Sequence, residues 1–335
     1  MHKIGITSTV PVEVLFAAGC QPVDLNNIFI NDPSPGRLVG AAERHGFPLN
    51  SCTWIKGIFS AALEQQIRTV IGVTSGDCSN TLMLMEVLEL NGVTSIPFAY
   101  PPEPNEAAMA HSLDLFSAKF GTTVTAAQDV AESLRPCRGL LSKLDALTWR
   151  ENRATGMDNH YWLVSASDFN GDPETFCSQL NTEVCRIESQ KQFPEETLRL
   201  AFCGVPAVYG RQLYPFLEEN GAKVVFNEVQ RQFAMLGDAD SLAARYSVYT
   251  YPYPIRYRIA DIRAECRKRQ VDGIIHYVQA FCHRAIGDIV FRRRLEYPIL
   301  TLEGSAEFFL TQHTKTRLEA FLDMLRQYRK TKKEK

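Results

Sequence analysis

Short apolar runs alternate with helix-like segments at both ends of this chain of 335 residues, and this alternation limits its fold more than any other feature. After residue 198 the sequence changes from strand-like to helix-like and back several times, with short connections. Residues 1–100 follow the same rhythm. Alternation of this kind is typical of parallel sheets that carry helices on both faces. The sequence therefore predicts an α/β protein.

The middle of the chain lacks strand-like runs, and its pattern is mostly helical from about residue 105 to 195. We therefore predict three parts: an N-terminal α/β lobe over residues 1–104, a helical connecting region over 105–195, and a C-terminal α/β lobe over 196–335. Each lobe is expected to be a Rossmann-like parallel sheet.

Three local features complete this reading of the chain. The run PVEVLFAAGC has apolar residues at helical spacing, and Gly19 is a plausible stop signal. The segment from Asn31 to Arg37 reads as a loop because of its composition. The last six residues, KTKKEK, are expected to be a solvated tail rather than a nucleic-acid site.

Charge and composition exclude several classes of protein. The formal net charge is -2, with 45% hydrophobic and 22% charged residues, so neither nucleic acid nor an anionic membrane is an expected partner. Pro11 and Glu13 interrupt the apolar N-terminal stretch, which therefore does not read as a signal peptide. No run is long enough for a membrane span. Nine cysteines, an odd number, favour thiols or metal ligands over disulfides, and we expect a cytoplasmic protein.

Three of the cysteines occupy positions where an α/β fold builds its sites. Cys78 and Cys282 follow apolar, strand-like runs, and Cys52 opens an apparent helix. The carboxyl ends of strands in open α/β sheets are the usual place for ligand sites. Three thiolates on a four-iron cluster would leave one iron free for a substrate, so a reaction centre is conceivable.

Spacing alone does not identify these cysteines as ligands. The chain has no C-x-x-C motif, which excludes ferredoxin-type, zinc-ribbon and thioredoxin-like patterns. Spacing by itself favours buried small hydrophobes. Local context favours ligation at Cys78, because the N-terminal end of a helix stabilises a thiolate. Both interpretations remain open on these grounds.

Five segments, in order along the chain, resemble one family. They are PVEVLFAAGCQPVDL, NSCTWIKG, VTSGDCSNT, DGIIHYVQAFCH, and PILTLEG followed by TRLEAFLDML. Together they resemble the iron–sulfur subunits of 2-hydroxyacyl-CoA dehydratases and benzoyl-CoA reductases. The resemblance implies that Cys52, Cys78 and Cys282 ligate one cubane [4Fe-4S] cluster.

A branch of the same family implies a second form of the cofactor. That branch is homodimeric and carries an 8Fe-9S double-cubane cluster, which needs six thiolates. Two chains could supply three each, or one chain could recruit more of its own cysteines. Cys203 and then Cys20 are the spare candidates, although a structural role is the favoured interpretation of both.

The source of electrons also follows from the resemblance. The chain has neither a P-loop nor a G-x-G-x-x-G motif, so a separate ATP-dependent iron–sulfur activator is implied. The expected function is a low-potential one-electron reduction of a small substrate, in a homodimer or a heterodimer with a related subunit. The chain is short for this family, which weakens the expectation of a coenzyme A thioester. The alternatives are a non-catalytic electron-transfer subunit and an α/β protein without metal.

Three further side chains are candidates for catalysis. Glu228 and Glu303 follow strand-like runs and are expected near the same crevice, as proton donors or as groups that support the site. A helix cap or an ion pair is the competing interpretation for both. His283 follows Cys282 directly, and with Arg284 it could supply positive charge.

Overall fold

The structure, a computed structural model, describes residues 2–305 and 307–333 and contains two four-stranded parallel sheets. This arrangement confirms the predicted α/β class with two Rossmann-like lobes. The first sheet has the order β2-β1-β3-β4 and the second the order β6-β5-β7-β8. Their strands are β1 (His2–Ile6), β2 (Cys20–Asp24), β3 (Thr69–Ser75), β4 (Thr94–Ala99), β5 (Leu198–Gly204), β6 (Ala222–Asn227), β7 (Gly273–Gln279) and β8 (Ile299–Gly304).

The two sheets repeat one topology. In each, the first strand along the chain is flanked by the second and third strands, and the fourth lies at the edge beyond the third. All neighbouring strands pair in parallel. The third strands, β3 and β7, therefore hold equivalent places, and their carboxyl ends lead to Cys78 and Cys282.

Helices cover both faces of the first sheet. On one face, Val70 of β3 packs into a core with Leu25 and Phe29 from the helix that follows β2. The opposite face joins Ile4 and Ile71 to a larger core that continues into the middle of the chain. The helices of this lobe are α1 (Val12–Ala17), α2 (Leu25–Asn31), α3 (Pro35–Arg44), α4 (Thr53–Glu64) and α5 (Asn80–Leu90).

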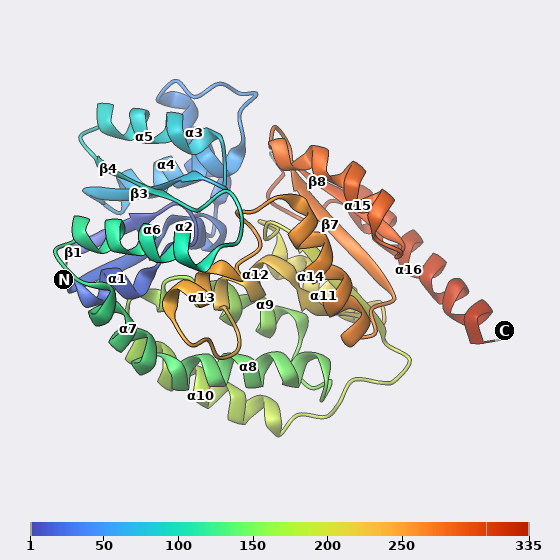
Figure 1. Ribbon diagram of the computed structural model, residues 1–335. Coiled ribbons are helices and arrows are strands. Elements are labelled where there is room, and N and C mark those ends of the chain that lie inside the picture. Colours follow the sequence, from blue (N-terminus) through green and yellow to red (C-terminus); the bar gives the residue numbers. More distant parts are fainter. Residues whose placement is uncertain (1, 306, 334–335) are drawn as a thin grey trace.

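The described residues between β4 and β5 contain helices and no strand. In Figure 1, α8 and α10 run along the side of the molecule opposite α3 and α5, below both lobes. Leu141 and Val184 carry these two helices into the larger core. The elements are α6 (Glu106–Lys119), α7 (Val124–Ser133), α8 (Arg135–Trp149), α9 (Gly156–Ser165), η1 (Phe169–Gly171) and α10 (Pro173–Glu188).

The second sheet is also covered on both faces. Leu200 and Ile275 face one core with Leu322, whereas Ala201 and Ile274 face another with Phe291. The helices of this lobe are α11 (Gly210–Glu219), α12 (Glu228–Ala234), α13 (Leu242–Ser247), α14 (Ile255–Lys268), η2 (His283–Gly287), α15 (Asp288–Arg294) and α16 (Gln312–Lys333).

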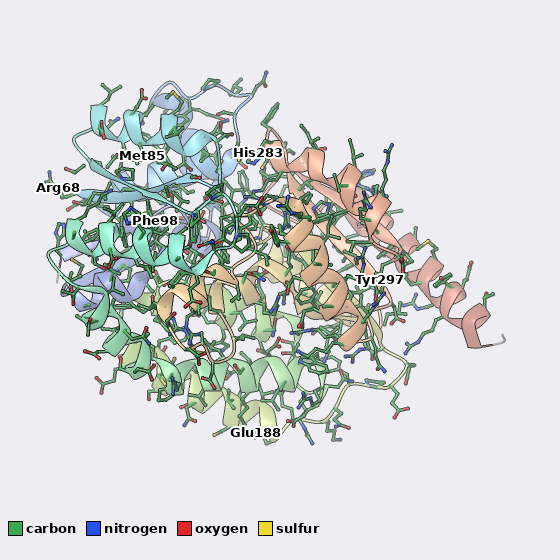
Figure 2. All side chains as sticks on the ribbon, viewed as in Figure 1. Arg68, Met85, Phe98, Glu188, His283 and Tyr297 are labelled. Atoms are coloured by element: carbon green, nitrogen blue, oxygen red, sulfur yellow. The ribbon has the colours of Figure 1, made fainter. Side chains whose placement is uncertain are left out.

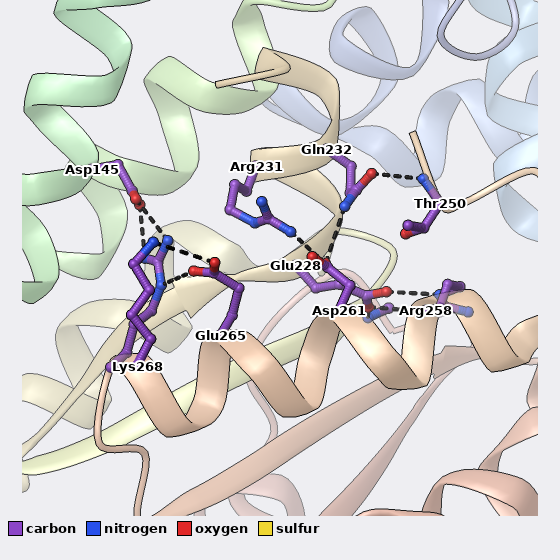
Figure 3. Close-up of polar contacts among 11 residues, drawn as sticks. Asp145, Glu228, Arg231, Gln232, Thr250, Arg258, Asp261, Glu265 and Lys268 are labelled. Atoms are coloured by element: carbon purple, nitrogen blue, oxygen red, sulfur yellow. Dashed lines mark hydrogen bonds and ion pairs between the residues drawn. The ribbon is translucent and has the colours of Figure 1, made fainter. Parts of the chain in front are cut away.

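A row of buried and half-buried ion pairs joins α14 to α8 and α12 (Figure 3). Arg269, just after α14, donates to both carboxylate oxygens of Asp145 on α8, at 2.8 and 2.7 Å. Arg258, in the first turn of α14, makes a two-bond contact with Glu228 of α12. These pairs fix α8 of the helical region against the second lobe, and α12 against α14 within that lobe.

The structure corrects three local predictions. The segment from Asn31 to Arg37 is not one loop, because α2 ends at Asn31 and α3 begins at Pro35. Proline fits the first turn of a helix, where its missing N–H leaves no bond unmade. Residues 330–333 continue α16 instead of forming a tail, and residues 334–335 lie outside the described part. Strands β1 and β2 had no counterpart in the prediction. Gly19, by contrast, follows α1 with a φ of +69°, as a helix stop does.

No helix in the described ranges, 2–305 and 307–333, is both long enough and apolar enough to cross a membrane.

Candidate metal centre

A cavity lies where the carboxyl ends of strands from both sheets meet. Its empty volume is about 760 Å³, including space open to solvent. Residues that follow β1, β2, β3, β5 and β7 line it, together with the first turn of α4. The wall is mainly apolar, with contributions from Ile30, Trp54 and Phe233. Cys52, Cys78 and Cys282 all line this one cavity.

Cys52 sits at the N-terminal end of α4. It is 5% exposed and holds the N-cap position of the helix. The backbone N–H groups of Trp54 and Ile55 lie near its sulfur and act to lower the pKa of the thiol. The buried Lys56 donates to Leu49 O at 2.9 Å and pairs with Glu43 at 2.9 Å. The loop that leads into Cys52 is thereby tied to the body of the lobe.

Cys78 sits in the turn between β3 and α5. Its sulfur lies near the backbone N–H of Asn80, at the start of the helix, and this N–H acts to lower the pKa of the thiol. Gly76 begins the turn with a φ of +91°, and a Cβ atom there would lie 2.6 Å from Pro252. Only glycine fits both requirements without strain. The route of the chain from β3 to Cys78 therefore depends on Gly76.

Cys282 follows β7 and holds the N-cap position of η2. Its backbone N–H donates to Gln279 O at 3.1 Å, and its carbonyl accepts from the Ala285 N–H at 3.0 Å. The residue before it, Phe281, has a φ of +62° and is 62% exposed. All three cysteines thus stand where a helical segment begins, and the free N–H groups and positive end of a helix favour a thiolate there.

Hydrogen bonds between the lobes fix the three cysteine segments relative to one another. Gln279 Nε2 donates to Thr53 Oγ1 at 2.8 Å, next to Cys52. Arg284 Nη2 donates to Gly76 O at 2.9 Å and to Tyr251 O at 3.1 Å. The Arg284 guanidinium also lies 3.9 Å from the centre of the Tyr251 ring, a cation–π contact. One clamp joins the Cys52 and Cys282 segments, and the other joins those of Cys78 and Cys282.

Burial acts against ionisation of the thiols when no metal is bound. Burial raises the pKa of Cys52, although the Trp54 and Ile55 N–H groups oppose this rise. Burial and then the nearby Asp77 raise the pKa of Cys78 to about 12, against the effect of the Asn80 N–H. Desolvation therefore outweighs the helix ends, and a bound metal would have to displace the thiol protons.

A second, more open cavity adjoins the first. Its empty volume is about 1700 Å³, open solvent included. Asp77, Cys78, His283 and Arg284 line both cavities. The remaining wall is rich in proline, with Pro101, Pro102, Pro252 and Pro254. The open cavity provides a path from solvent to the side of the cysteine cavity that holds Cys78.

The three other candidate side chains occupy different surroundings. His283 is exposed at the junction of the lobes (Figure 2), and burial followed by the charge of Arg284 lowers its pKa. Glu228 is buried in the pair with Arg258 and accepts the Gly204 N–H at 3.0 Å. Burial opposes its ionisation, but Arg258 outweighs burial and lowers the pKa of Glu228. Glu303 is exposed near the end of β8. Of the three, His283 lines the cysteine cavity.

The spare cysteines are not among the lining residues of this cavity. Cys203 is fully buried within β5, and Cys20 begins β2, at the end of the strand opposite the carboxyl edge. Within residues 2–305 and 307–333, no three His, Cys, Asp or Glu side chains form a group that could hold a single metal ion. A four-iron cluster is larger than one ion, so its ligands stand further apart around a cavity.

The sequence interpretation did not single out the clamps. Thr53 and Gln279 directly adjoin the predicted cysteine segments, but nothing in the sequence pairs them. For Arg284 the sequence indicates only a positive charge beside Cys282. Tyr251 belongs to an aromatic and proline-rich stretch, and this composition was the one available signal that the stretch contacts the site.

Comparison with known proteins identifies the family. A search of curated proteins finds no match to this chain. The family described as 2-hydroxyglutaryl-CoA dehydratase, D-component, matches residues 7–325. This match includes both lobes and all three cavity cysteines. The chain therefore belongs to the 2-hydroxyglutaryl-CoA dehydratase D-component family, which supports a role as a component of a 2-hydroxyacyl-CoA dehydratase-type system.

Proposed function

We propose that this chain is an iron–sulfur reductase or dehydratase component that holds one [4Fe-4S] cluster on Cys52, Cys78 and Cys282. The observation that carries the proposal is the convergence of these three thiols on one cavity, although they come from segments far apart in the sequence. Family membership supports the same class of function.

The residues of the cavity fit a cluster by their chemistry. Soft thiolates are the usual protein ligands of iron–sulfur clusters. Backbone N–H groups near the sulfurs of Cys52 and Cys78 would stabilise the ligands in their anionic form and tune a bound cluster. The apolar wall limits the access of water. The guanidinium of Arg284 adds positive charge beside an anionic centre.

The number of thiols favours a single cubane for each chain. Within residues 2–305 and 307–333, the lining of the cavity includes three cysteines, whereas a double cubane needs six. An 8Fe-9S cluster would therefore have to draw three thiolates from each of two chains. We propose the single cubane, and we treat the shared double cubane as an outcome that the experiment below distinguishes.

The chain's own groups would bind and orient the substrate. A cluster held by three thiolates supplies a low-potential electron and an iron that is open to a substrate. A small molecule would enter through the open cavity and meet His283 and Arg284, which line both cavities. His283 would donate a hydrogen bond to the substrate, and Arg284 would keep the two cysteine loops in place. Glu228 and Glu303 would not contact a substrate bound there.

The partners follow from the family and from the sequence. The chain has no phosphate-binding loop, so the electrons would come from a separate ATP-dependent iron–sulfur activator. A related subunit or a second copy of this chain would complete the assembly.

The test combines composition with turnover. The protein would be prepared without oxygen, assayed for iron and acid-labile sulfide, and then supplied with a reductant, ATP and an activator of this family. We expect equal amounts of iron and sulfide and reduction or dehydration of a small substrate. A sulfide-to-iron ratio above one would indicate the double cubane instead. A normal cluster without turnover on any substrate would favour an electron-transfer subunit, and a chain without iron would refute the proposal.

A further inference from the structure

Two cysteines with no part in the candidate metal centre lie together in the helical region. Cys137 is on α8 and Cys177 is on α10, and these helices pack side by side. The two side chains are close enough for Cys177 to raise the pKa of Cys137, and both lie at the contact between α8 and α10. Cys137 is 2% exposed and belongs to the main core, and the half-buried Cys177 packs against that core.

A hollow in the surface gives small molecules access to this pair. Both cysteines line it, with Leu134 and Leu140 on one side and Pro173 and Ser178 on the other. Its empty volume is about 950 Å³, open solvent included. A dissolved reagent can therefore reach the half-buried thiol without unfolding of either helix.

We infer that Cys137 and Cys177 form a reversible dithiol–disulfide site that responds to low-molecular-weight disulfides. A disulfide needs the Cα atoms of its two residues about 4.4–6.8 Å apart, and the packing of α8 against α10 brings both thiols to one hollow. The site is separate from the cavity of Cys52, Cys78 and Cys282, and it does not depend on the proposed function. The bond would join α8 to α10 covalently.

The order of the reaction follows from the burial of the two thiols. The Cys177 thiolate attacks a small disulfide, forms a mixed disulfide and releases one small thiol. Cys137 then loses its proton and attacks the Cys177 sulfur, which expels the second small thiol. The protein gives up two electrons and two protons, and the small disulfide becomes two thiols. Burial raises the pKa of Cys137, so this residue is expected to be the resolving thiol.

Glutathione disulfide is the probe for the test. The full-length protein, in the reduced state, would be incubated with it, alkylated with iodoacetamide, and mapped by tryptic mass spectrometry. Cys185, which is exposed on the same helix as Cys177, provides a matched control through the variant Cys185→Ser. We expect a Cys137–Cys177 bridge in the wild type and in Cys185→Ser, reversed by dithiothreitol, and no such bridge in Cys177→Ser.

Two results would overturn the inference. One is a wild-type protein in which Cys185 carries glutathione, while Cys137 and Cys177 both stay reduced and are alkylated by iodoacetamide. The other is a stable mixed disulfide on Cys177 that Cys137 never resolves. Because the assay reads thiols and does not require iron, its failure would leave the proposed function untouched.

Discussion

The side chain of Gln279 donates a hydrogen bond to Thr53 Oγ1 at 2.8 Å and thereby joins the two lobes beside two candidate ligands. Thr53 follows Cys52 directly, and Gln279 ends the strand that leads to Cys282. The same amide also donates to Gly304 O at 2.9 Å. Because both groups are buried, the bond sets the positions of the Cys52 and Cys282 segments relative to one another.

Replacement of Thr53 by valine tests this bond. Thr53→Val keeps the shape of the side chain but leaves a buried Gln279 N–H without its partner, so the free energy of unfolding should fall by about 1–3 kcal/mol. Urea denaturation measures the change. Thr94→Val, on an exposed position of β4, is the control and should change little. Equal effects of the two substitutions would show that the bond between the lobes contributes no stability.

Arg284 should hold the Cys78 loop through the geometry of its guanidinium rather than through charge alone. Arg284→Lys keeps the positive charge but loses the planar group that contacts both Gly76 O and the Tyr251 ring. We expect faster amide hydrogen exchange in residues 74–79 of the metal-free protein, by about tenfold, which corresponds to about 1.4 kcal/mol. The exposed Arg267→Lys is the control. An unchanged exchange rate in Arg284→Lys would show that the guanidinium of Arg284 does not hold the Cys78 loop.

The carboxyl group of Glu228 has two possible roles, as a structural ion-pair partner or as a proton donor. In the structure its carboxylate makes two hydrogen bonds with Arg258, at 2.7 and 2.8 Å. Glu228→Gln leaves a buried guanidinium without its counter-ion, and the free energy of unfolding should fall by about 3–5 kcal/mol. Adding Arg258→Met should restore part of this loss. A Glu228→Gln variant with normal stability and no turnover would favour the proton-donor role instead.

The sequence predicts the parts of this protein that local patterns encode. Cys78 and Cys282 follow strands that their apolar runs identify, and Gly19 marks a helix end that needs a positive φ. β3 and β7 hold equivalent places in their sheets. This equivalence depends on the order of the strands in each sheet, which a local sequence pattern does not predict. The sequence does not predict the short strands β1 and β2, because each has five residues with too few apolar positions to form a recognisable strand pattern.

The contacts that complete the site are tertiary and could not be read from the sequence. Thr53 and Gln279 are 226 residues apart, and neither has a special local pattern. Glu228 follows a strand in the way a site residue would, yet Arg258 from the next long helix neutralises it. Such pairings depend on the relative placement of packed elements, so the sequence limited the candidates but did not select among them.

Buried Lys223 should give the stability of the protein a distinct pH dependence. Burial, with repulsion from Arg199 as a smaller cause, lowers the pKa of Lys223 from 10.5 to about 7. Between these values the unfolded chain binds more protons than the folded chain, so stability should rise as the pH rises through this window. From pH 7 to 9, wild type should gain about 2–3 kcal/mol relative to Lys223→Met.

Urea denaturation at both pH values measures this difference. The half-exposed Lys268→Met is the control for the loss of a lysine side chain. A constant difference between wild type and Lys223→Met across this range would contradict the lowered pKa.

The most direct test of the central claim is the cluster content of matched cysteine variants. Wild type, Cys78→Ala and Cys177→Ala would be reconstituted without oxygen and assayed for iron and acid-labile sulfide per chain. We expect about four of each in wild type and in Cys177→Ala, as a cubane requires, and loss of most of both in Cys78→Ala. Equal iron in the two variants, or a wild-type chain that takes up none, would contradict the assignment of Cys52, Cys78 and Cys282 as cluster ligands.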